Sequence, residues 1–96
     1  MQLLFEVTSE GAADVLLQLA RACDRIDVSW GCFFTGDGVL NLSSDDVSQA
    51  LKTAVTAKTC EHSWQQHMGE RTCPVELGSQ TSNSSMVGDA DRVISL

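Results

Sequence analysis

Residues Val55–Met68 read V-T-A-K-T-C-E-H-S-W-Q-Q-H-M, and the pattern of side chains changes in the middle of this stretch. Its first half favours a β-strand, whereas Trp64 and Met68 follow the i, i+4 spacing of a helix. The change predicts a strand that ends at Cys60 and a helix that begins directly after it. A thiol at a helix N-terminus faces unpaired N–H groups and the positive end of the helix dipole, which favour the thiolate. Cys60 is therefore a candidate reactive cysteine; the alternative is a small buried side chain in the core of a sheet.

The N-terminal third of the chain predicts a strand, a helix and a second strand, the size of one βαβ unit. Gln2–Val7 is apolar except at its ends, which is typical of a buried strand. Thr8 or Ser9 is the expected N-terminal cap of the following helix, and the second strand is expected over Ile26–Phe34. The predicted apolar face of the helix consists of Ala12, Val15, Leu16, Leu19, Ala20 and Cys23.

Glycine and serine residues interrupt the apolar pattern after the second strand. We expect Gly36–Gly38 to form a loop at the C-terminal end of that strand. The alternative is the tight turn of a β-hairpin, with Val39–Leu42 as its return strand. Ser43 or Ser44 is then expected to cap a helix that has two aspartates in its first turn, where they face the positive end of the helix dipole.

The C-terminal part of the chain predicts three further short elements. The helix after Cys60 is expected to end at Gly69, and Val75–Leu77 to form a very short strand. The serine-rich residues Ser79–Asn83 predict a loop, followed by one or two helical turns over Ser84–Asp89. A closing strand is predicted over residues 91–96. Its expected buried residues are Val93, Ile94 and Leu96.

Alternating strands and helices of this length predict one α/β domain over residues 1–96. We expect a small flavodoxin-like fold of three layers, with a mostly parallel sheet of about five strands and helices on both faces. The C-terminal ends of parallel strands meet at one edge of such a sheet, where ligand and reaction sites form. Thr8, the Gly36–Gly38 loop, Cys60 and the loop at Gly78 and Ser79 are expected at this edge.

The charge of the chain argues against two classes of partner. Six Lys and Arg stand against thirteen Asp and Glu, a net charge of −7, and the basic residues form no cluster. We therefore expect neither nucleic-acid binding nor binding to anionic membranes, and favour a protein or small-molecule partner. The sequence has no apolar run of the roughly 20 residues that a membrane span needs. Its N-terminus lacks the pattern of a signal peptide, so we expect a cytoplasmic protein.

Three segments in order along the chain resemble a known family. Phe33–Val39 (F-F-T-G-D-G-V), then Cys60 at a strand end, then Ala90–Ile94 (A-D-R-V-I), are similar to the DsrE/TusD group of the DsrE/F-like superfamily. These are small flavodoxin-like proteins of sulfur relay. The resemblance implies that Cys60 carries sulfane sulfur as a persulfide between donor and acceptor proteins, as in tRNA thiolation or sulfur oxidation. It also implies no metal or organic cofactor, and assembly with homologous subunits or as a homo-oligomer, a trimer or hexamer.

The resemblance also suggests which residues support Cys60. Ser63 and the backbone N–H groups after Cys60 would stabilise the charged sulfur, and His62 would assist proton transfer. Glu61 would disfavour the thiolate unless it points into solvent. The supporting loop consists of Gly36, Asp37 and Gly38. Members of the group are usually longer, and some subunits lack the active cysteine, so a non-catalytic structural or interaction subunit is the alternative.

Two further hypotheses involve Cys73. Cys60, His62, His67 and Cys73 form a C-x-H-x4-H-x5-C pattern of zinc ligands, which would make the protein a small zinc-binding module. The two histidines are five residues apart, so they would point in different directions on a helix. Alternatively, Cys73 would be the resolving thiol for an oxidised Cys60, which requires Cα atoms within about 7 Å.

Overall fold

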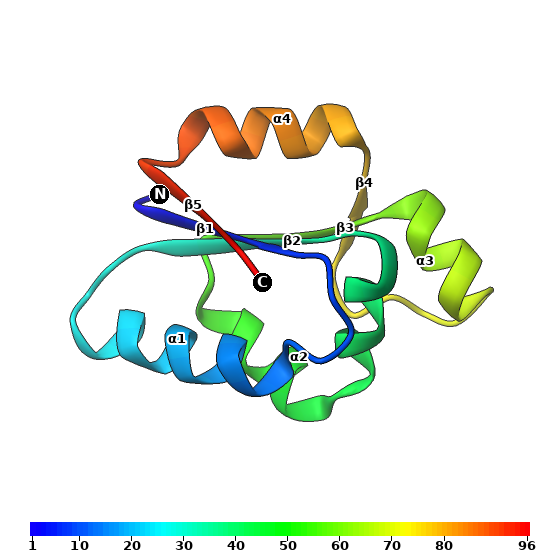
Figure 1. The fold of residues 1–96 in the computed structure, drawn as a ribbon, viewed down its shortest axis with the longest axis horizontal. Helices are drawn as coiled ribbons and strands as arrows, with labels where there is room; N and C mark the ends of the chain where they lie inside the picture. The colour runs from blue at the N-terminus through cyan, green and yellow to red at the C-terminus, as the bar shows by residue number, and fades with distance from the viewer.

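The computed structural model describes residues 1–96, in which strands and helices alternate (Figure 1). The five strands form one sheet in the order β4-β3-β2-β1-β5, and all neighbouring pairs are parallel. The predicted α/β class is therefore confirmed. The elements are β1 (Leu3–Val7), α1 (Ala13–Arg25), β2 (Trp30–Phe34), the 3-10 helix η1 (Gly36–Ser43), α2 (Asp45–Ala50), the 3-10 helix η2 (Leu51–Thr53), β3 (Thr56–Cys60), α3 (Glu61–Met68), β4 (Glu76–Gly78), α4 (Gln80–Asp89) and β5 (Arg92–Ser95).

The sheet is the middle of three layers. Figure 1 shows α4 on one face and α1 and α2 on the other, with α3 beyond the end of β3. The layers are those of a flavodoxin-like fold, although flavodoxin itself has the strand order 2-1-3-4-5. Here the chain moves outward from β1 to β4 and then returns to place β5 on the other side of β1. No helix has the length and apolar character needed to span a membrane.

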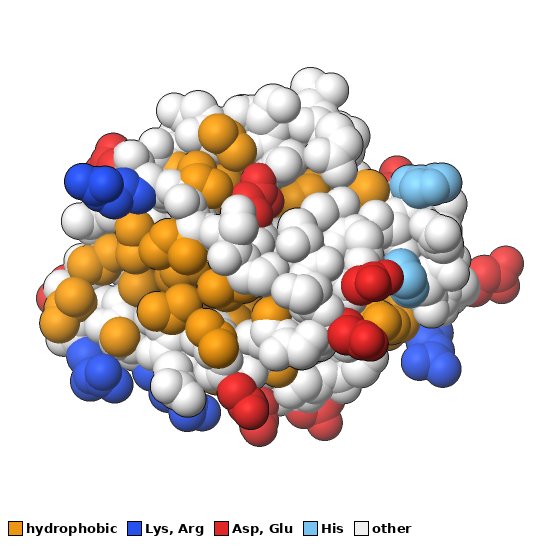
Figure 2. All heavy atoms as spheres, viewed as in Figure 1, with side chains coloured by type: hydrophobic (Ala, Val, Ile, Leu, Met, Phe, Trp, Pro, Cys, Tyr) orange, Lys and Arg blue, Asp and Glu red, His pale blue; other side chains and the backbone are white.

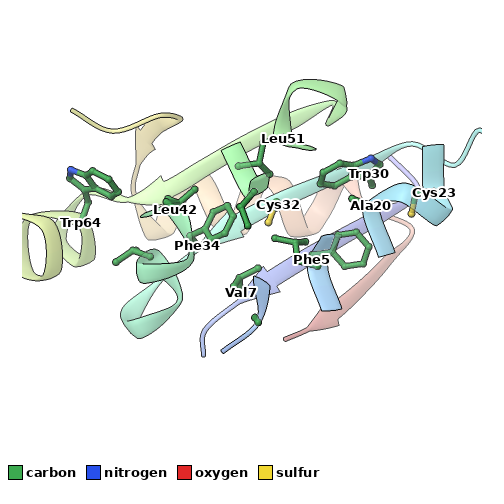
Figure 3. Packing of buried hydrophobic residues seen from close by; sticks show 14 residues of the cluster. Phe5, Val7, Ala20, Cys23, Trp30, Cys32, Phe34, Leu42, Leu51 and Trp64 are labelled. Atoms are coloured by element: carbon green, nitrogen blue, oxygen red, sulfur yellow. The ribbon is translucent and has the colours of Figure 1, made fainter. Parts of the chain in front are cut away.

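Two apolar clusters hold the layers together. A cluster of 14 buried residues lies between the sheet and α1 and α2, and Figure 3 shows Phe5, Trp30, Cys32 and Phe34 pointing into it. The Phe5 and Trp30 rings pack with their centroids 5.9 Å apart. A smaller cluster beneath α4 consists of Leu4, Phe33, Cys60 and Met86. The two faces of the sheet therefore place Cys32 and Cys60 in different cores.

Two predicted buried side chains are exposed. Val15 is 50% exposed, although Leu16, Ala20 and Cys23 of the same helix are buried as predicted. Val93 is 43% exposed because β5 is an edge strand with a neighbour on one side only. Figure 2 shows a patch of apolar side chains at the surface, in the region where Figure 1 places β5 and α1.

The start of α1 and the start of β2 differ from the prediction. Neither Thr8 nor Ser9 caps the helix, because the N-cap position is Ala12. The backbone N–H groups of Thr8 and Ser9 instead bind the Leu96 carbonyl and extend the pairing of β1 with the last strand. The helix begins at Ala13 without a side-chain cap. Its C-terminal end reaches Ile26, which is 71% exposed, so β2 begins only at Trp30.

The Gly36–Gly38 segment is neither the predicted loop nor the turn of a hairpin. It begins η1, which runs to Ser43, so the return strand over residues 39–42 is wrong. Gly38 lies so close to the carbonyl group of Val7 that a Cβ atom would collide with it, which explains the need for glycine. Ser44 caps α2 as predicted, because its hydroxyl oxygen accepts a hydrogen bond from the Val47 N–H at 3.3 Å.

The serine-rich segment is helical, and the predicted loop over residues 79–83 is wrong. Ser79 is the N-cap of α4, and it forms a capping box with Ser82 in which each side chain accepts from the backbone N–H of the other. These bonds satisfy N–H groups that the first turn of a helix leaves free. Met86 is the one buried residue of α4, so the helix has little apolar burial to stabilise it and depends on its capping hydrogen bonds.

Candidate functional site

Cys60 lies where the sequence predicts it, at the junction of a strand and a helix. It is the last residue of β3 and the N-cap of α3. At its other end, α3 stops at Gly69, where φ is 65°, a backbone conformation that glycine adopts without strain. The Cys60 residue is 7% exposed and borders an open pocket of about 340 Å³. The pocket also contacts His62 and Gln80, so the sulfur atom lies between the N-termini of α3 and α4.

Hydrogen-bond donors make the Cys60 thiol more acidic than a free cysteine. Burial by itself raises its pKa, but the Ser63 hydroxyl, the backbone N–H groups of Ser63 and His62, and the Gln80 side chain act on the sulfur as nearby donors and lower the pKa. Their combined effect leaves the pKa below its ordinary value. The free N–H groups of a helix N-terminus stabilise a negative charge in this way.

Ser63 is positioned to donate to Cys60 by a bond on its other side. It is buried, and its Oγ accepts a hydrogen bond of 2.9 Å from the backbone N–H of Gly36. Because that bond uses an acceptor site of the hydroxyl, the O–H proton remains available for the sulfur. The predicted support from Ser63 and from Gly36 is therefore one connected arrangement, in which β2, η1 and α3 meet.

Gln80 is a contributor that the sequence reasoning missed. It is the first residue of α4, and its Nε2 donates to the Thr35 hydroxyl at 3.4 Å. Its side chain also lowers the pKa of the Cys60 thiol. The sequence predicts a loop over residues 79–83, so it does not place Gln80 at the start of a helix. The Ser79 and Ser82 pair, spaced as in a capping box, was the signal that would have placed a helix N-terminus beside Cys60.

The remaining predicted residues lie around the site in different ways. The side chain of His62 borders the pocket, as does exposed Glu61. Asp37 is not among the residues that line the pocket, because its Oδ1 pairs with His67 Nε2 at 3.4 Å and so joins η1 to the end of α3. Figure 2 shows histidine and acidic side chains together at this end of the molecule.

Cys73 is not brought to Cys60. It packs against the larger cluster, whereas Cys60 belongs to the smaller cluster on the opposite face of the sheet. Burial raises the pKa of the Cys73 thiol, and all four cysteines are free. No three His, Cys, Asp or Glu side chains gather in metal-binding geometry, so the predicted four-ligand zinc site does not form. The structure thus gives no geometric basis for Cys73 as a resolving thiol.

A larger pocket, about 500 Å³, lies between α4 and the first half of β3. Lys58 and Ser82 line it, but Cys60 does not, and Lys58 is paired with Glu76 at 3.2 Å. Its size therefore does not make it the better candidate.

No protein-family model matches the chain, and no curated protein matches it. The function must be inferred from the site at Cys60.

Proposed function

We propose that this protein is a sulfur-relay carrier, a sulfurtransferase that holds sulfane sulfur as a persulfide on Cys60. The observation that carries the proposal is the set of donors around the sulfur, from Ser63, His62 and Gln80, beside an open pocket. These donors favour the thiolate, which is the form that reacts. A persulfide adds one sulfur atom about 2.05 Å beyond the first, and the pocket lies beside that position.

The transfer is an exchange at sulfur. The Cys60 thiolate attacks the outer sulfur of a donor persulfide, a new S–S bond forms, the S–S bond of the donor breaks, and the donor leaves as a thiolate. A thiolate of the acceptor protein then attacks the outer sulfur on Cys60, which returns to a thiolate. Each step consumes one thiolate and releases one, so it requires no external oxidant, reductant, metal or organic cofactor. The Ser63 and Gln80 side chains, which lower the pKa of Cys60, favour it as the leaving thiolate in the second step.

The order of motifs that resembles the DsrE/TusD group supports the same proposal. The proposal includes a cytoplasmic location and assembly with homologous subunits or as a trimer or hexamer. The pathway served would be tRNA thiolation or sulfur oxidation. The four free cysteines suit a reducing compartment. The acidic net charge of −7 suits protein partners better than direct contact with nucleic acid.

A second candidate is a non-catalytic subunit that binds a homologous chain. The observation that favours it is the low exposure of Cys60, which is 7% exposed and packs with Leu4, Phe33 and Met86. In that case the thiol would serve as a small apolar side chain of the core beneath α4.

Intact-mass spectrometry separates the two candidates. The protein is exposed to inorganic polysulfide without reductant, alongside Cys60→Ser and the matched control Cys73→Ser, because Cys73 is the most accessible of the other thiols. A carrier gains one or more sulfur atoms as wild type and as Cys73→Ser, but not as Cys60→Ser. It then loses that sulfur when a thiol acceptor is added. If wild type and Cys60→Ser gain the same sulfur, or neither gains any, the carrier proposal is wrong.

A further inference from the structure

One side of α1 carries apolar residues that no other element covers. The buried side of the helix packs on the sheet, and another side faces α2 across a pocket that Leu17 and Arg21 border. The side opposite α2 consists of residues at the helical spacings i, i+4, i+7 and i+11, which are Val15, Leu19, Ala22 and Ile26. The first and last of these are exposed, and the other two are partly exposed.

This side of α1 is continuous with the edge of the sheet. Because α2 lies in the connection from β2 to β3, it is on the β3 side of α1, and the opposite side of α1 faces β1 and β5. Ile94 and Leu96 lie on the α1 face of the sheet and are only partly buried (Figure 2). The α1–β5 patch is the set Val15, Leu19, Ala22, Ile26, Ile94 and Leu96. Monomeric proteins rarely expose a continuous apolar surface of this kind, which is typical of an interaction site.

Charged side chains of opposite sign lie at the two ends of the α1–β5 patch. Glu10 and Asp14 lie where α1 begins and β5 ends. Arg25 and Arg92 lie where α1 ends and β5 begins, and Figure 2 shows basic side chains above and below the apolar surface on the left. Arg92 is two residues before Ile94, so it lies on the same face of the strand. The patch is therefore acidic at one end and basic at the other.

The aspartates near the basic end are turned away from the patch. Asp24 accepts hydrogen bonds from Trp30 Nε1 at 3.0 Å and from Thr53 Oγ1 at 2.8 Å. Asp27 borders the same pocket as Asp24 and Thr53, on the α2 side of the helix. Asp91 alternates with the residues that face α1, so it lies toward α4. These carboxylates leave the basic end available to an acidic partner surface.

A surface with this arrangement of charge is complementary to itself. We propose that the α1–β5 patch binds the same patch of a second copy of the chain across a two-fold axis, with the two α1 helices antiparallel. The acidic end of each copy then meets the basic end of the other, which favours this orientation over the parallel one. Val15 meets Ile26 of the second copy, and Leu19 meets the smaller Ala22, because each pair is equally far from the middle of the row.

This contact goes beyond the proposed function and does not depend on the persulfide. Cys60 packs on the other face of the sheet, beneath α4. A two-fold contact can occur in a dimer or a hexamer, but three copies in a ring cannot form it. Of the assemblies included in the proposed function, the contact therefore favours the hexamer.

Analytical ultracentrifugation of the whole chain over a range of concentrations measures the number of copies. We expect an even number, of which the smallest is a dimer with twice the chain mass of 10.3 kDa. A trimer would overturn the proposal. A monomer at every concentration up to about 1 mM would also overturn it, because weaker association is not a specific contact.

Val15→Lys tests the location of the contact. A buried charge in the middle of an apolar interface should weaken association about tenfold or more. The matched control is Val87→Lys, which changes a valine of similar exposure, 40% against 50%, on the helix that covers the other face of the sheet. The control should keep the wild-type association. Equal effects of the two variants, or no effect of Val15→Lys, would overturn the proposal.

A charge exchange tests the two-fold orientation. Asp14→Lys and Arg25→Glu should each weaken association severalfold at low salt, because like charges then meet across the axis. The double variant should restore most of the loss. Damage to the helix cannot explain such a recovery, since both changes oppose the helix dipole and their costs to α1 add. A double variant that associates no better than the single variants would overturn the antiparallel arrangement.

Sulfur loading of Cys60 is measured separately on the same proteins. Cys60→Ser should keep the wild-type number of copies, and Val15→Lys should still gain sulfur. Failure of wild type to load contradicts the proposed function and leaves the two-fold contact standing. A protein that loads but stays monomeric contradicts the contact and leaves the carrier proposal standing.

Discussion

Cys32 and Cys60 lie on neighbouring parallel strands and are both buried, yet their thiols have opposite character. Burial raises the pKa of Cys32 well above its ordinary value, and the nearby charge of Glu6 adds to the effect. Burial also acts on Cys60, but hydrogen-bond donors reverse the shift. Cys32 lies inside its strand, where the neighbouring backbone groups are used by the sheet, while Cys60 ends its strand and faces the free N–H groups of α3. The position along the strand, together with the complete burial of Cys32, decides which thiol can react.

The largest expected difference is in the rate of chemical modification. Cys60 should react with iodoacetamide at neutral pH through small local motions, whereas Cys32, which is 0% exposed, requires a larger opening of the core. We expect Cys60 to be modified about a thousandfold faster. Peptide mapping by mass spectrometry after timed exposure gives both rates in one sample. Similar rates would show that the accessibility and acidity of the two thiols do not differ as the structure indicates.

Serine substitutions should separate the two positions by stability. Cys32→Ser places a hydroxyl in an apolar core and should lower the free energy of unfolding by about 1–3 kcal/mol. Cys60→Ser places a hydroxyl at a helix N-cap, where it can accept from N–H groups, and should change stability by less than about 0.5 kcal/mol or raise it. Denaturant unfolding measures both. A larger loss for Cys60→Ser than for Cys32→Ser would contradict this comparison.

Ser63→Ala tests the hydroxyl that supports the thiolate. Its removal takes a donor from Cys60 and leaves the Gly36 N–H without an acceptor. The pKa of Cys60 should rise, alkylation at neutral pH should slow severalfold, and stability should fall by about 1–2 kcal/mol. The exposed Ser84→Ala is the matched control and should leave the alkylation profile of Cys60 unchanged. An unchanged profile in Ser63→Ala would show that its hydroxyl does not stabilise the sulfur.

Gln80→Ala should have the smallest effect of this series. Gln80 is exposed and contributes the last and weakest of the donors to Cys60, so the pKa of the thiol should rise less than in Ser63→Ala. The pH dependence of alkylation measures the shift, with exposed Gln66→Ala as the control. A shift larger than that of Ser63→Ala would reverse the order of the two donors.

The features that the sequence predicts well depend on local patterns. The change of periodicity at Cys60, the strand β1 and the cap of α2 all appear where expected. Gly69 ends α3 because a left-handed backbone there favours glycine. The cap of α2 and the end of α3 depend on residues that are near in the chain, and β1, although it pairs with distant strands, is marked by its own apolar pattern. The local sequence therefore contains the information needed for all of them.

The features that the sequence misses depend on contacts between distant segments. The helix α4 has one buried residue, Met86, and many serines, so its apolar pattern is weak and its composition is typical of a loop. Its capping box and the sheet beneath it outweigh that composition. The backbone N–H groups of Thr8 and Ser9 bind the Leu96 carbonyl, and neither residue caps a helix. Gln80 lies near Cys60 only because α4 returns over β3. Such contacts leave no periodic signal.

The pairing of β1 with β5 has a consequence for synthesis on the ribosome. Leu3–Glu6 pairs with Arg92–Ser95, so an inner strand of the sheet has a partner that is synthesised about 90 residues later. The pairing of β1 with β2 can form early, but one edge of β1 stays bare until residue 95 has emerged. Contacts of such long range slow folding, and an unpaired strand edge can capture another nascent chain. Factors that shield β1 during translation should therefore improve the yield of folded protein more than factors that act after release.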